Sequence, residues 1–273
     1  MKIGIIGTGN MGRILAESLL DKKVVSPSST RITNRTKSKA LLLKDKYNGL
    51  RVDKTAEEVA AQSDLVFICV KPLDIWPILQ KIKPYLTEQK CLVSITSPIS
   101  VEQLESIVPC SVVRAIPSIT NRAFSGVSLL TFGNRCRPEW KKRMDDLFSK
   151  ISVPVEIEES ITRVASDIVS CGPAFFSYLS QRFISAATSQ TEINEEVATK
   201  LTSEMLIGLG ELLRQGHYTL PTLQEKVCVK GGITGEGIKV LEKEVGEMFE
   251  HLFQATHAKF EEDLEKVQKQ FST

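Results

Sequence analysis

The sequence has little that is typical of metal-binding, disulfide-bonded or membrane proteins. Its three histidines form no metal pattern, and its six cysteines are scattered without C-x-x-C or zinc-ligand spacing. No apolar run approaches the length of a membrane span, and no signal-peptide cleavage pattern is present. We therefore expect a cytoplasmic protein with reduced thiols, no bound metal and no membrane contact.

An excess of charge of either sign is also lacking. The 273 residues include 35 Lys and Arg against 33 Asp and Glu, a net charge of +2, and the cations are spread through the sequence. This distribution gives no electrostatic reason to expect nucleic acid as a partner. The composition is globular, with 42% hydrophobic and 25% charged residues, and the length fits two domains of ordinary size.

Short apolar strands alternate with amphipathic helices over residues 1–159, and strand signals disappear from residue 160 on. Alternation of this kind predicts βαβ crossovers and a doubly wound, mostly parallel sheet, the Rossmann type of α/β fold. We therefore expect an NADP-binding domain over residues 1–159 and an all-α dimerisation and substrate domain over residues 160–273. The expected strands cover residues 2–6, 31–34, 65–70, 92–96, 112–116, 127–132 and 153–157.

The second half reads as helices that are interrupted at Gly172-Pro173, Gly216, Pro221 and the loop of residues 231–237. Apolar residues recur at three- and four-residue steps from Val240 to Phe271, which predicts one long amphipathic helix. Residues 175–187 and 197–213 are also rich in apolar positions, more than a small helical domain can bury alone. A homodimer through these helices is the expected solution, and burial against the first domain is the alternative.

The first expected strand runs into G-T-G-N-M-G, a G-x-G-x-x-G pattern that opens a helix. Gly7 permits the tight turn, Gly9 lets the backbone approach a pyrophosphate, and Gly12 lets helix and strand pack closely. Free N–H groups at the helix start supply the anion site. A strand that ends in V-K-P should also border the cofactor. The expected cofactor-binding residues are Gly7, Thr8, Gly9, Asn10, Met11, Gly12, Asn34, Arg35, Thr36, Val70, Lys71 and Pro72.

The end of the second expected strand favours NADPH over NADH. A carboxylate there would bind the ribose 2′-hydroxyl of NAD, but the sequence has Asn34, Arg35 and Thr36. Cationic and hydroxyl donors suit a 2′-phosphate. NADPH is therefore the expected cofactor, and NADH is the second choice.

A nine-residue stretch near the end, V-K-G-G-I-T-G-E-G at residues 229–237, contains four glycines. By itself, Gly-Gly-Ile-Thr before a helix is more often a plain helix start than a binding loop. Backbone amides at a helix N-terminus nevertheless suit a small carboxylate, and a positioned hydroxyl can hydrogen-bond a C=N nitrogen as charge moves onto it.

The whole chain resembles the pyrroline-5-carboxylate reductase family. The resemblance rests on the order and spacing of G-T-G-N-M-G, N-R-T, V-K-P, R-A-I-P at 114–117, C-G-P-A-F at 171–175, and the late loop. It implies an enzyme that reduces a small cyclic imine carboxylate, 1-pyrroline-5-carboxylate, to L-proline by hydride transfer from NAD(P)H. It also implies an interlocked homodimer, with a higher oligomer as a further option, in which the substrate site is completed between subunits.

The resemblance gives the late loop a role in substrate binding and catalysis. The N–H groups of Gly231, Gly232 and Ile233 would bind the substrate carboxylate, and Thr234 would be the catalytic hydroxyl at the imine nitrogen. Lys230 could pair with the same carboxylate, and a solvated surface lysine is the alternative.

Several positions depart from the family pattern. Val229-Lys230 stands where Ser-Pro is usual, Gly235-Glu236 follows the threonine, I-P-S-I-T replaces M-P-N-T-P, I-T-S-P at 95–98 replaces an A-A-G turn beside the nicotinamide, and Ala56 stands where asparagine often contacts the cofactor. Divergent members from late-competence operons, the ComER type, are similar to this chain. Three possibilities therefore stay open: a working imine reductase, a reductase of another small imine or keto acid, and a catalytically weak or inactive NADP(H)-binding paralogue with a regulatory role.

The 3-hydroxyacid dehydrogenases share the G-x-G-x-M-G start and the N-R-T stretch. They need a catalytic lysine in a G-x-x-x-K-x-x-N-N pattern, and nothing after residue 160 matches it. We therefore do not expect that activity.

Overall fold

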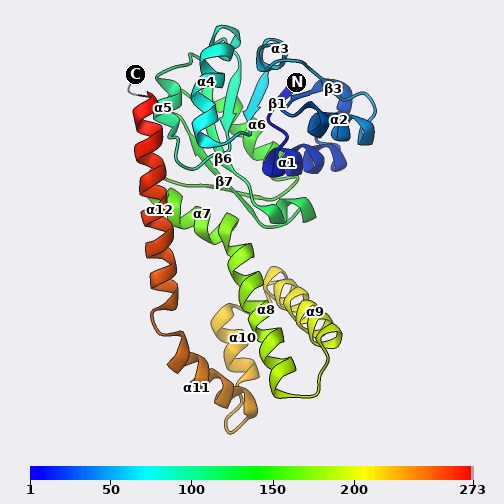
Figure 1. The fold of residues 1–273 in the computed structure, drawn as a ribbon, viewed down its shortest axis with the longest axis vertical. Helices are drawn as coiled ribbons and strands as arrows, with labels where there is room; N and C mark the ends of the chain where they lie inside the picture. The colour runs from blue at the N-terminus through cyan, green and yellow to red at the C-terminus, as the bar shows by residue number, and fades with distance from the viewer. Residues whose placement is uncertain (272–273) are drawn as a thin grey trace. The chain divides into compact units, whose positions relative to one another are not determined.

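The computed structural model describes residues 1–271 and divides into two compact units (Figure 1). The first unit comprises Met1–Pro173 and the chain from Ala255 on, and the second is Ala174–Gln254. Packing therefore places the region from residue 160 to Pro173, and most of the last helix, with the sheet. The predicted boundary at residue 160 does not coincide with this division, and the functional assignment of residues 1–159 and 160–273 stays a prediction.

An eight-stranded sheet forms the centre of the first unit. Its strand order is β3-β2-β1-β4-β5-β6-β7-β8, and every neighbouring pair is parallel except the antiparallel β6 and β7. The doubly wound, mostly parallel sheet is thus confirmed. The two-residue β3 was not predicted, because so short a strand leaves no apolar pattern. The strands are β1 (Ile3–Ile6), β2 (Thr30–Thr33), β3 (Arg51–Val52), β4 (Leu65–Ile68), β5 (Cys91–Ser94), β6 (Ser111–Ile116), β7 (Val127–Phe132) and β8 (Val153–Glu156).

Helices connect these strands and cover the sheet (Figure 1). Most crossovers contain a short α-helix, and the connection from β6 to β7 is a single 3₁₀ turn. The helices of this unit are α1 (Asn10–Asp21), α2 (Lys37–Lys46), α3 (Ala56–Ala61), α4 (Pro72–Ile82), α5 (Val101–Glu105), α6 (Pro138–Phe148) and α7 (Thr162–Ser166), with 3₁₀ turns η1 (Pro27–Ser29), η2 (Lys83–Tyr85), η3 (Ile119–Ala123) and η4 (Glu159–Ile161).

Two apolar clusters form the core, one on each face of the sheet. Successive strand residues point to opposite faces, so that in β4 Leu65 and Phe67 join one cluster while Val66 and Ile68 join the other. Val267, from the last helix, is fully buried in the second cluster. Residues far apart in the sequence therefore share one core.

The second unit consists of helices only. They are α8 (Gly172–Gln190), α9 (Glu195–Arg214), α10 (Leu220–Val227), α11 (Ile233–Val245) and the start of α12 (Met248–Phe271). Within Ala174–Gln254 only Ala198 and Thr202 are buried. Many large apolar side chains of this unit are exposed instead; they include Phe176, Phe183, Leu201, Met205, Ile207, Leu220, Val240 and Leu241.

Two predictions about the helices are wrong. The expected long helix from Val240 to Phe271 ends at Val245 and resumes at Met248, with Gly246 at φ 45° between them. Gly172-Pro173 does not interrupt a helix, because α7, a π-helical turn (Asp167–Cys171, η5 in the helix numbering) and α8 follow one another without a gap. The wide π turn comes immediately before Pro173 and accommodates its ring and its missing N–H.

Within residues 1–271, none of the helices is both long and apolar enough to cross a bilayer. In that same part of the chain, no group of three or more His, Cys, Asp or Glu side chains could hold a metal ion.

Candidate functional site

A cavity of about 620 Å³ opens at the carboxyl ends of β1, β2 and β4 in the first unit. This edge of a doubly wound sheet is where the strand order reverses and where ligands bind. Seven of the predicted cofactor residues line the cavity, namely Gly7, Gly9, Asn34, Arg35, Thr36, Val70 and Lys71. Thr8, Asn10, Met11 and Gly12 form the adjoining turn and the first turn of α1, and Pro72 lines a neighbouring cavity.

The glycine turn has the geometry that a pyrophosphate needs. Gly9 is the N-cap of α1, it has no side-chain cap, and the first turn contains no acidic residue. A Cβ added to Gly9 would have no atom within 4 Å, whereas one added to Gly12 would overlap the carbonyl oxygen of Gly7. Gly12 is therefore required by packing, and Gly9 leaves space and free N–H groups for an anion.

Asn34 fixes the turn from the neighbouring strand. Its Oδ1 accepts from the N–H of Thr8 at 2.9 Å, and its Nδ2 donates to the carbonyl oxygen of Thr36 at 2.9 Å. The hydroxyl of Thr8 is buried and has no hydrogen-bond partner among residues 1–271. Asn34 thus fixes the conformation of the glycine turn. The hydroxyl oxygen of Thr8 is the unpaired polar atom of this turn.

Cations surround the end of the cavity near β2. Arg35 is exposed and lies 3.8 Å from Asp74, and Lys39 and Lys54 line the same wall. Lys54 follows β3, the strand that sequence reasoning missed, so its position could not be predicted. These side chains suit a 2′-phosphate, as expected for NADPH.

A second cavity of about 560 Å³ lies within the first unit at the carboxyl ends of β5 and β6. Its wall includes the turn from Ile95 to Pro98, which was expected beside the nicotinamide, together with the π turn and part of α12. A dinucleotide bound across the β1–β4 switch point extends toward this side of the sheet. The second cavity is therefore the candidate space for the reacting groups.

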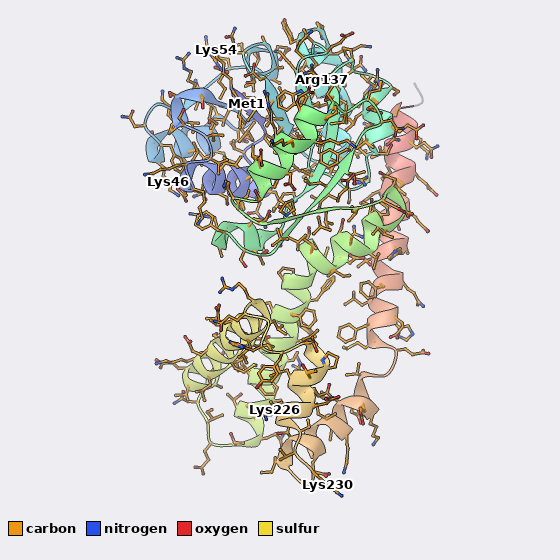
Figure 2. All side chains as sticks on the ribbon, turned by 180° about the vertical axis from the view of Figure 1, so that it is seen from behind. Met1, Lys46, Lys54, Arg137, Lys226 and Lys230 are labelled. Carbon is orange, nitrogen blue, oxygen red and sulfur yellow. The ribbon has the colours of Figure 1, made fainter. Side chains whose placement is uncertain are left out.

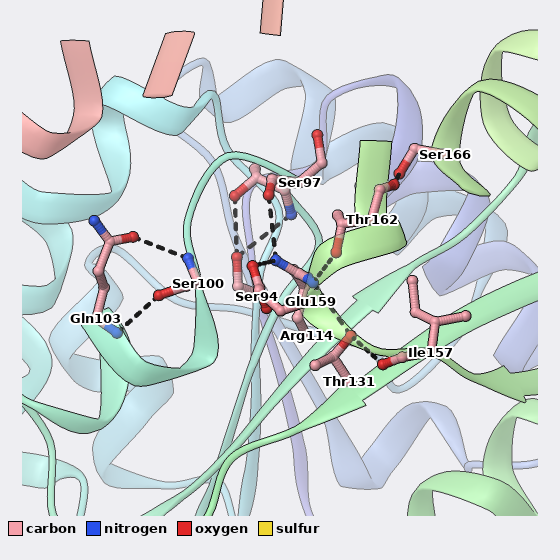
Figure 3. Close-up of polar contacts among 11 residues, drawn as sticks. Ser94, Ser97, Ser100, Gln103, Arg114, Thr131, Ile157, Glu159, Thr162 and Ser166 are labelled. Atoms are coloured by element: carbon pink, nitrogen blue, oxygen red, sulfur yellow. Dashed lines mark hydrogen bonds and ion pairs between the residues drawn. The ribbon is translucent and has the colours of Figure 1, made fainter. Parts of the chain in front are cut away.

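Arg114 is the largest buried charged side chain beside this cavity, and Figure 3 shows its contacts. Its Nη1 donates to the carbonyl oxygen of Ser97 at 3.3 Å and to Glu159 Oε1 at 2.6 Å. Its Nη2 donates to the hydroxyls of Thr131 and Thr162 at 3.2 and 2.5 Å. The guanidinium joins four chain segments, one of which is the turn expected beside the nicotinamide. The sequence pattern R-A-I-P contained this residue, but gave no indication of its role.

A buried ion pair lies on the wall of the second cavity. Arg163 Nη2 donates to Asp167 Oδ1 at 2.7 Å, and the Asp167 side chain is fully buried. Thr256, 89 residues further along the chain, donates to Asp167 Oδ2 at 2.8 Å. Burial raises the pKa of the neighbouring Cys171 thiol, and the Arg163 cation lowers it to a smaller extent. None of these residues was predicted as a site residue, because the contacts join distant parts of the sequence.

The late loop lies in the second unit and opens α11 (Lys230 is labelled in Figure 2). Gly231 has φ 75°, a conformation that other residues rarely adopt. Gly232 is the N-cap, without a side-chain cap, so the amides of the first turn are unblocked. Thr234 is exposed, and Ile233 is 93% exposed. The loop geometry fits an anion-binding helix start, and its substrate role stays a prediction.

Together, the doubly wound sheet, the glycine turn and the cation-lined cavity define an NADP-dependent oxidoreductase fold. Residues 2–98 match the family model described as NADP oxidoreductase, coenzyme F420-dependent, and residues 159–263 match that of pyrroline-5-carboxylate reductase dimerisation. The cofactor prediction is confirmed at this level as NADP(H).

Comparison with known proteins then identifies the family. The chain is 57% identical over 271 residues to ComE operon protein 4 of Bacillus subtilis (strain 168), covering 99% of both chains. It is 32% identical to pyrroline-5-carboxylate reductase 3 of the same organism, covering 98% of this chain and 99% of the relative. The chain belongs to the pyrroline-5-carboxylate reductase family.

The resemblance expected from the sequence is thereby confirmed, including the similarity to the late-competence type. A solved structure has the same fold: Plasmodium falciparum pyrroline carboxylate reductase, with NADP bound, superposes with a TM-score of 0.81 at 24% identity and covers 99% of this chain and 98% of its own.

Proposed function

We propose that the protein is an NADPH-dependent imine reductase that converts 1-pyrroline-5-carboxylate to L-proline. The observation that carries the proposal is the first cavity, where Gly9 leaves space at an uncapped helix start and cations lie at the β2 end. Family membership supplies the reaction type. NADPH, when bound, supplies the hydride that the C=N carbon accepts.

The residues of this chain would bind and polarise the imine acid. The amides of Gly231 and Ile233, with Lys230, would bind the substrate carboxylate at the start of α11. The N–H of Gly232, predicted as a third donor, instead donates to the carbonyl oxygen of Val229 at 2.9 Å and would have to leave it to join them. The Thr234 hydroxyl would donate a hydrogen bond to the imine nitrogen, where negative charge develops as the carbon is reduced. Asn34 would hold the glycine turn in place, while Arg35 and Lys54 would pair with the 2′-phosphate.

A cytoplasmic homodimer through the second unit is part of this proposal. Its support is the near absence of buried side chains in Ala174–Gln254 and the match of residues 159–263 to a dimerisation family. Isolated helices with exposed apolar faces are not stable alone, and a second copy would cover them. The late loop would then complete the site of a partner subunit, as the family resemblance implies.

The test measures the loss of NADPH absorbance with pyrroline-5-carboxylate, for wild type, Thr234→Ala and Thr188→Ala. Thr188 is a matched control, since its hydroxyl only donates to the carbonyl oxygen of Ser185 in its own helix. We expect Thr234→Ala to lower kcat about 100-fold with the NADPH affinity unchanged, and Thr188→Ala to behave as wild type. Equal activity of all three proteins would contradict the role of Thr234.

A second candidate function is an NADP(H)-binding regulatory protein without turnover. Val229, Lys230, Gly235 and Glu236 depart from the family pattern, and Glu236 is bound by Lys239 at 2.7 Å in the first turn of α11. An acidic residue there weakens the attraction of the helix start for a carboxylate. NADPH binding without turnover of any cyclic imine would favour this candidate, and absence of NADPH binding would contradict both.

A further inference from the structure

Arg163 is held from three sides on the wall of the second cavity. Its Nη2 donates to Asp167 Oδ1 at 2.7 Å and to Cys171 Sγ at 3.5 Å. Its guanidinium carbon lies 5.4 Å from the centre of the Phe260 ring, a cation–π distance. The side chain is 16% exposed. All these residues belong to the first unit, so the arrangement is internal to one compact body.

Most of the donor capacity of Arg163 is unused. A guanidinium has five N–H donors, and both hydrogen bonds of Arg163 come from Nη2. Nη1 and Nε have no hydrogen-bond partner within residues 1–271, and Nε is buried. Lys259, the other cation on this wall, is engaged by Glu262 and Asp263 at 3.2 and 2.7 Å. Arg163 is therefore the cation in this cavity with donors to spare.

Asp167 holds the guanidinium of Arg163 in a fixed position. The carboxylate is fully buried, and its second oxygen accepts from Thr256, so both of its oxygens are occupied. A buried carboxylate of this kind orients the guanidinium before any ligand arrives. An anion that binds to Nη1 would then cost little side-chain entropy. The planar donors of arginine match the two oxygens of a carboxylate.

The location decides which compound would carry that carboxylate. The cavity lies at the ends of β5 and β6 and contains the turn from Ile95 to Pro98, on the opposite side of β1 from the cation-lined end near β2. The dinucleotide phosphates have their own donors in the first cavity. A carboxylate at Arg163 would therefore belong to the small compound that is reduced.

We propose that Arg163, oriented by Asp167, binds the carboxylate of the reacting compound and selects small imino acids over neutral imines. The inference rests on the proposed reductase function and deepens it. It gives the carboxylate a charged partner in the first unit, in addition to the amides expected from the loop of residues 231–233.

The experiment compares two ligands on the NADP⁺-loaded protein by calorimetry: L-proline and pyrrolidine, which is the same ring without the carboxylate. The tested variants are Arg163→Met and the double variant Arg163→Met/Asp167→Asn, which avoids leaving a buried carboxylate unpaired. Arg143→Met is the matched control, because Arg143 lies over the Trp140 ring on α6, outside the cavity.

We expect wild type and Arg143→Met to bind L-proline more tightly than pyrrolidine. The double variant should bind L-proline about 30-fold more weakly, with unchanged affinities for pyrrolidine and NADPH. Unchanged L-proline affinity in the double variant would overturn the proposal, and so would an equal loss of NADPH affinity, which would indicate a purely structural role. A wild type that does not distinguish the two ligands would also overturn it.

Turnover separates this inference from the proposed reaction. L-Proline binding that depends on Arg163, in a protein that does not reduce pyrroline-5-carboxylate, would contradict the reaction and support carboxylate recognition. Reduction of pyrroline-5-carboxylate with an unchanged KM in the double variant would support the reaction and overturn the role of Arg163.

Discussion

The two compact units differ in how they bury their apolar side chains. The first unit encloses two clusters around an eight-stranded sheet, and residues such as Phe67 and Trp140 are at most 1% exposed. The second unit leaves Ile207 64% exposed and Phe183 63% exposed, and only Ala198 and Thr202 in it are buried. Side chains of the same chemical kind thus have opposite environments in one chain.

This difference shows that the first unit carries its own core, whereas the second buries few apolar side chains within itself and, in the proposed homodimer, would bury them against a second copy. Burial of apolar area is the main favourable term in folding, and the second unit gains little of it from its own residues. Its stability and its oligomeric state should therefore change together. In the first unit, by contrast, substitutions in the core should change the free energy of unfolding without changing the oligomeric state.

The largest expected effect is on Ile207. In Ile207→Glu a charge would be introduced into the apolar face of α9, and we expect association of the subunits to be weakened by about 3 kcal/mol or more per contact, enough to give monomers at micromolar concentration. The matched control is Leu42→Glu on α2, where the native side chain is 61% exposed. Light scattering after size exclusion would report the mass. If the Ile207→Glu and Leu42→Glu variants had the same mass, the apolar face of α9 would not be an association surface, and the inferred difference between the two units would be contradicted.

The second expected effect separates packing from ligand binding within the first unit. Gly12→Ala should lower the free energy of unfolding by about 2 to 3 kcal/mol, because the new methyl overlaps a backbone carbonyl. Gly9→Ala should leave stability nearly unchanged and abolish NADPH binding, since its methyl occupies the space for the pyrophosphate.

Urea unfolding and NADPH titration measure these two outcomes. Gly235→Ala in α11 is the control from the second unit, because a Cβ there meets no atom within 4 Å and alanine favours a helix. Full NADPH binding by Gly9→Ala would contradict the cofactor assignment.

The smallest expected effect concerns pH and the buried thiols of the first unit. Burial raises the pKa of Cys110 from 9.0 to about 12 and that of Cys136 to about 11. Because the folded state keeps these protons longer than the unfolded state, the stabilisation is fully present below pH 9, decreases above it, and is lost once the pH has risen through 11 and 12. Each thiol should lower the free energy of unfolding by about 1 kcal/mol at pH 10 relative to pH 8.

Urea unfolding at the two pH values checks this prediction. The variant Cys110→Ala/Cys136→Ala should show a shallower dependence on pH, whereas Cys228→Ala, in the second unit, should follow wild type. If the free energy of unfolding of the double variant depended on pH as steeply as that of wild type, the loss of stability at alkaline pH would come from groups other than these two thiols.

The sequence predicted the first unit well because its signals are local. Short apolar runs that alternate with helical stretches defined seven of the eight strands, and the G-x-G-x-x-G spacing located the cofactor turn. The two-residue β3 was missed, and with it the position of Lys54. Pattern-based inference works where a property of neighbouring residues decides the structure.

Features that depend on distant contacts could not be predicted. Asp167 and Arg163 are only four residues apart in the sequence, but Thr256, which also hydrogen-bonds Asp167, comes from α12. Continuity across Gly172-Pro173 depends on a π turn, which has no recognised sequence pattern. The end of α11 at Val245 was missed because the apolar period continues across Gly246. The period reports which face is apolar, not whether the backbone is unbroken.

The burial of Val267 has a consequence for how the protein is made. One cluster of the core includes a helix that the ribosome produces only after the entire second unit: Val267 joins residues that lie between Ile6 and Val112, and Phe271 packs against Trp76 with ring centres 4.9 Å apart. Domains usually fold in the order of their synthesis. Here the second cluster stays incomplete, without Val267 and Phe271, until about residue 271 has left the ribosome. A nascent chain stopped before Ala255 would therefore lack part of the second apolar cluster, although every strand had already been translated.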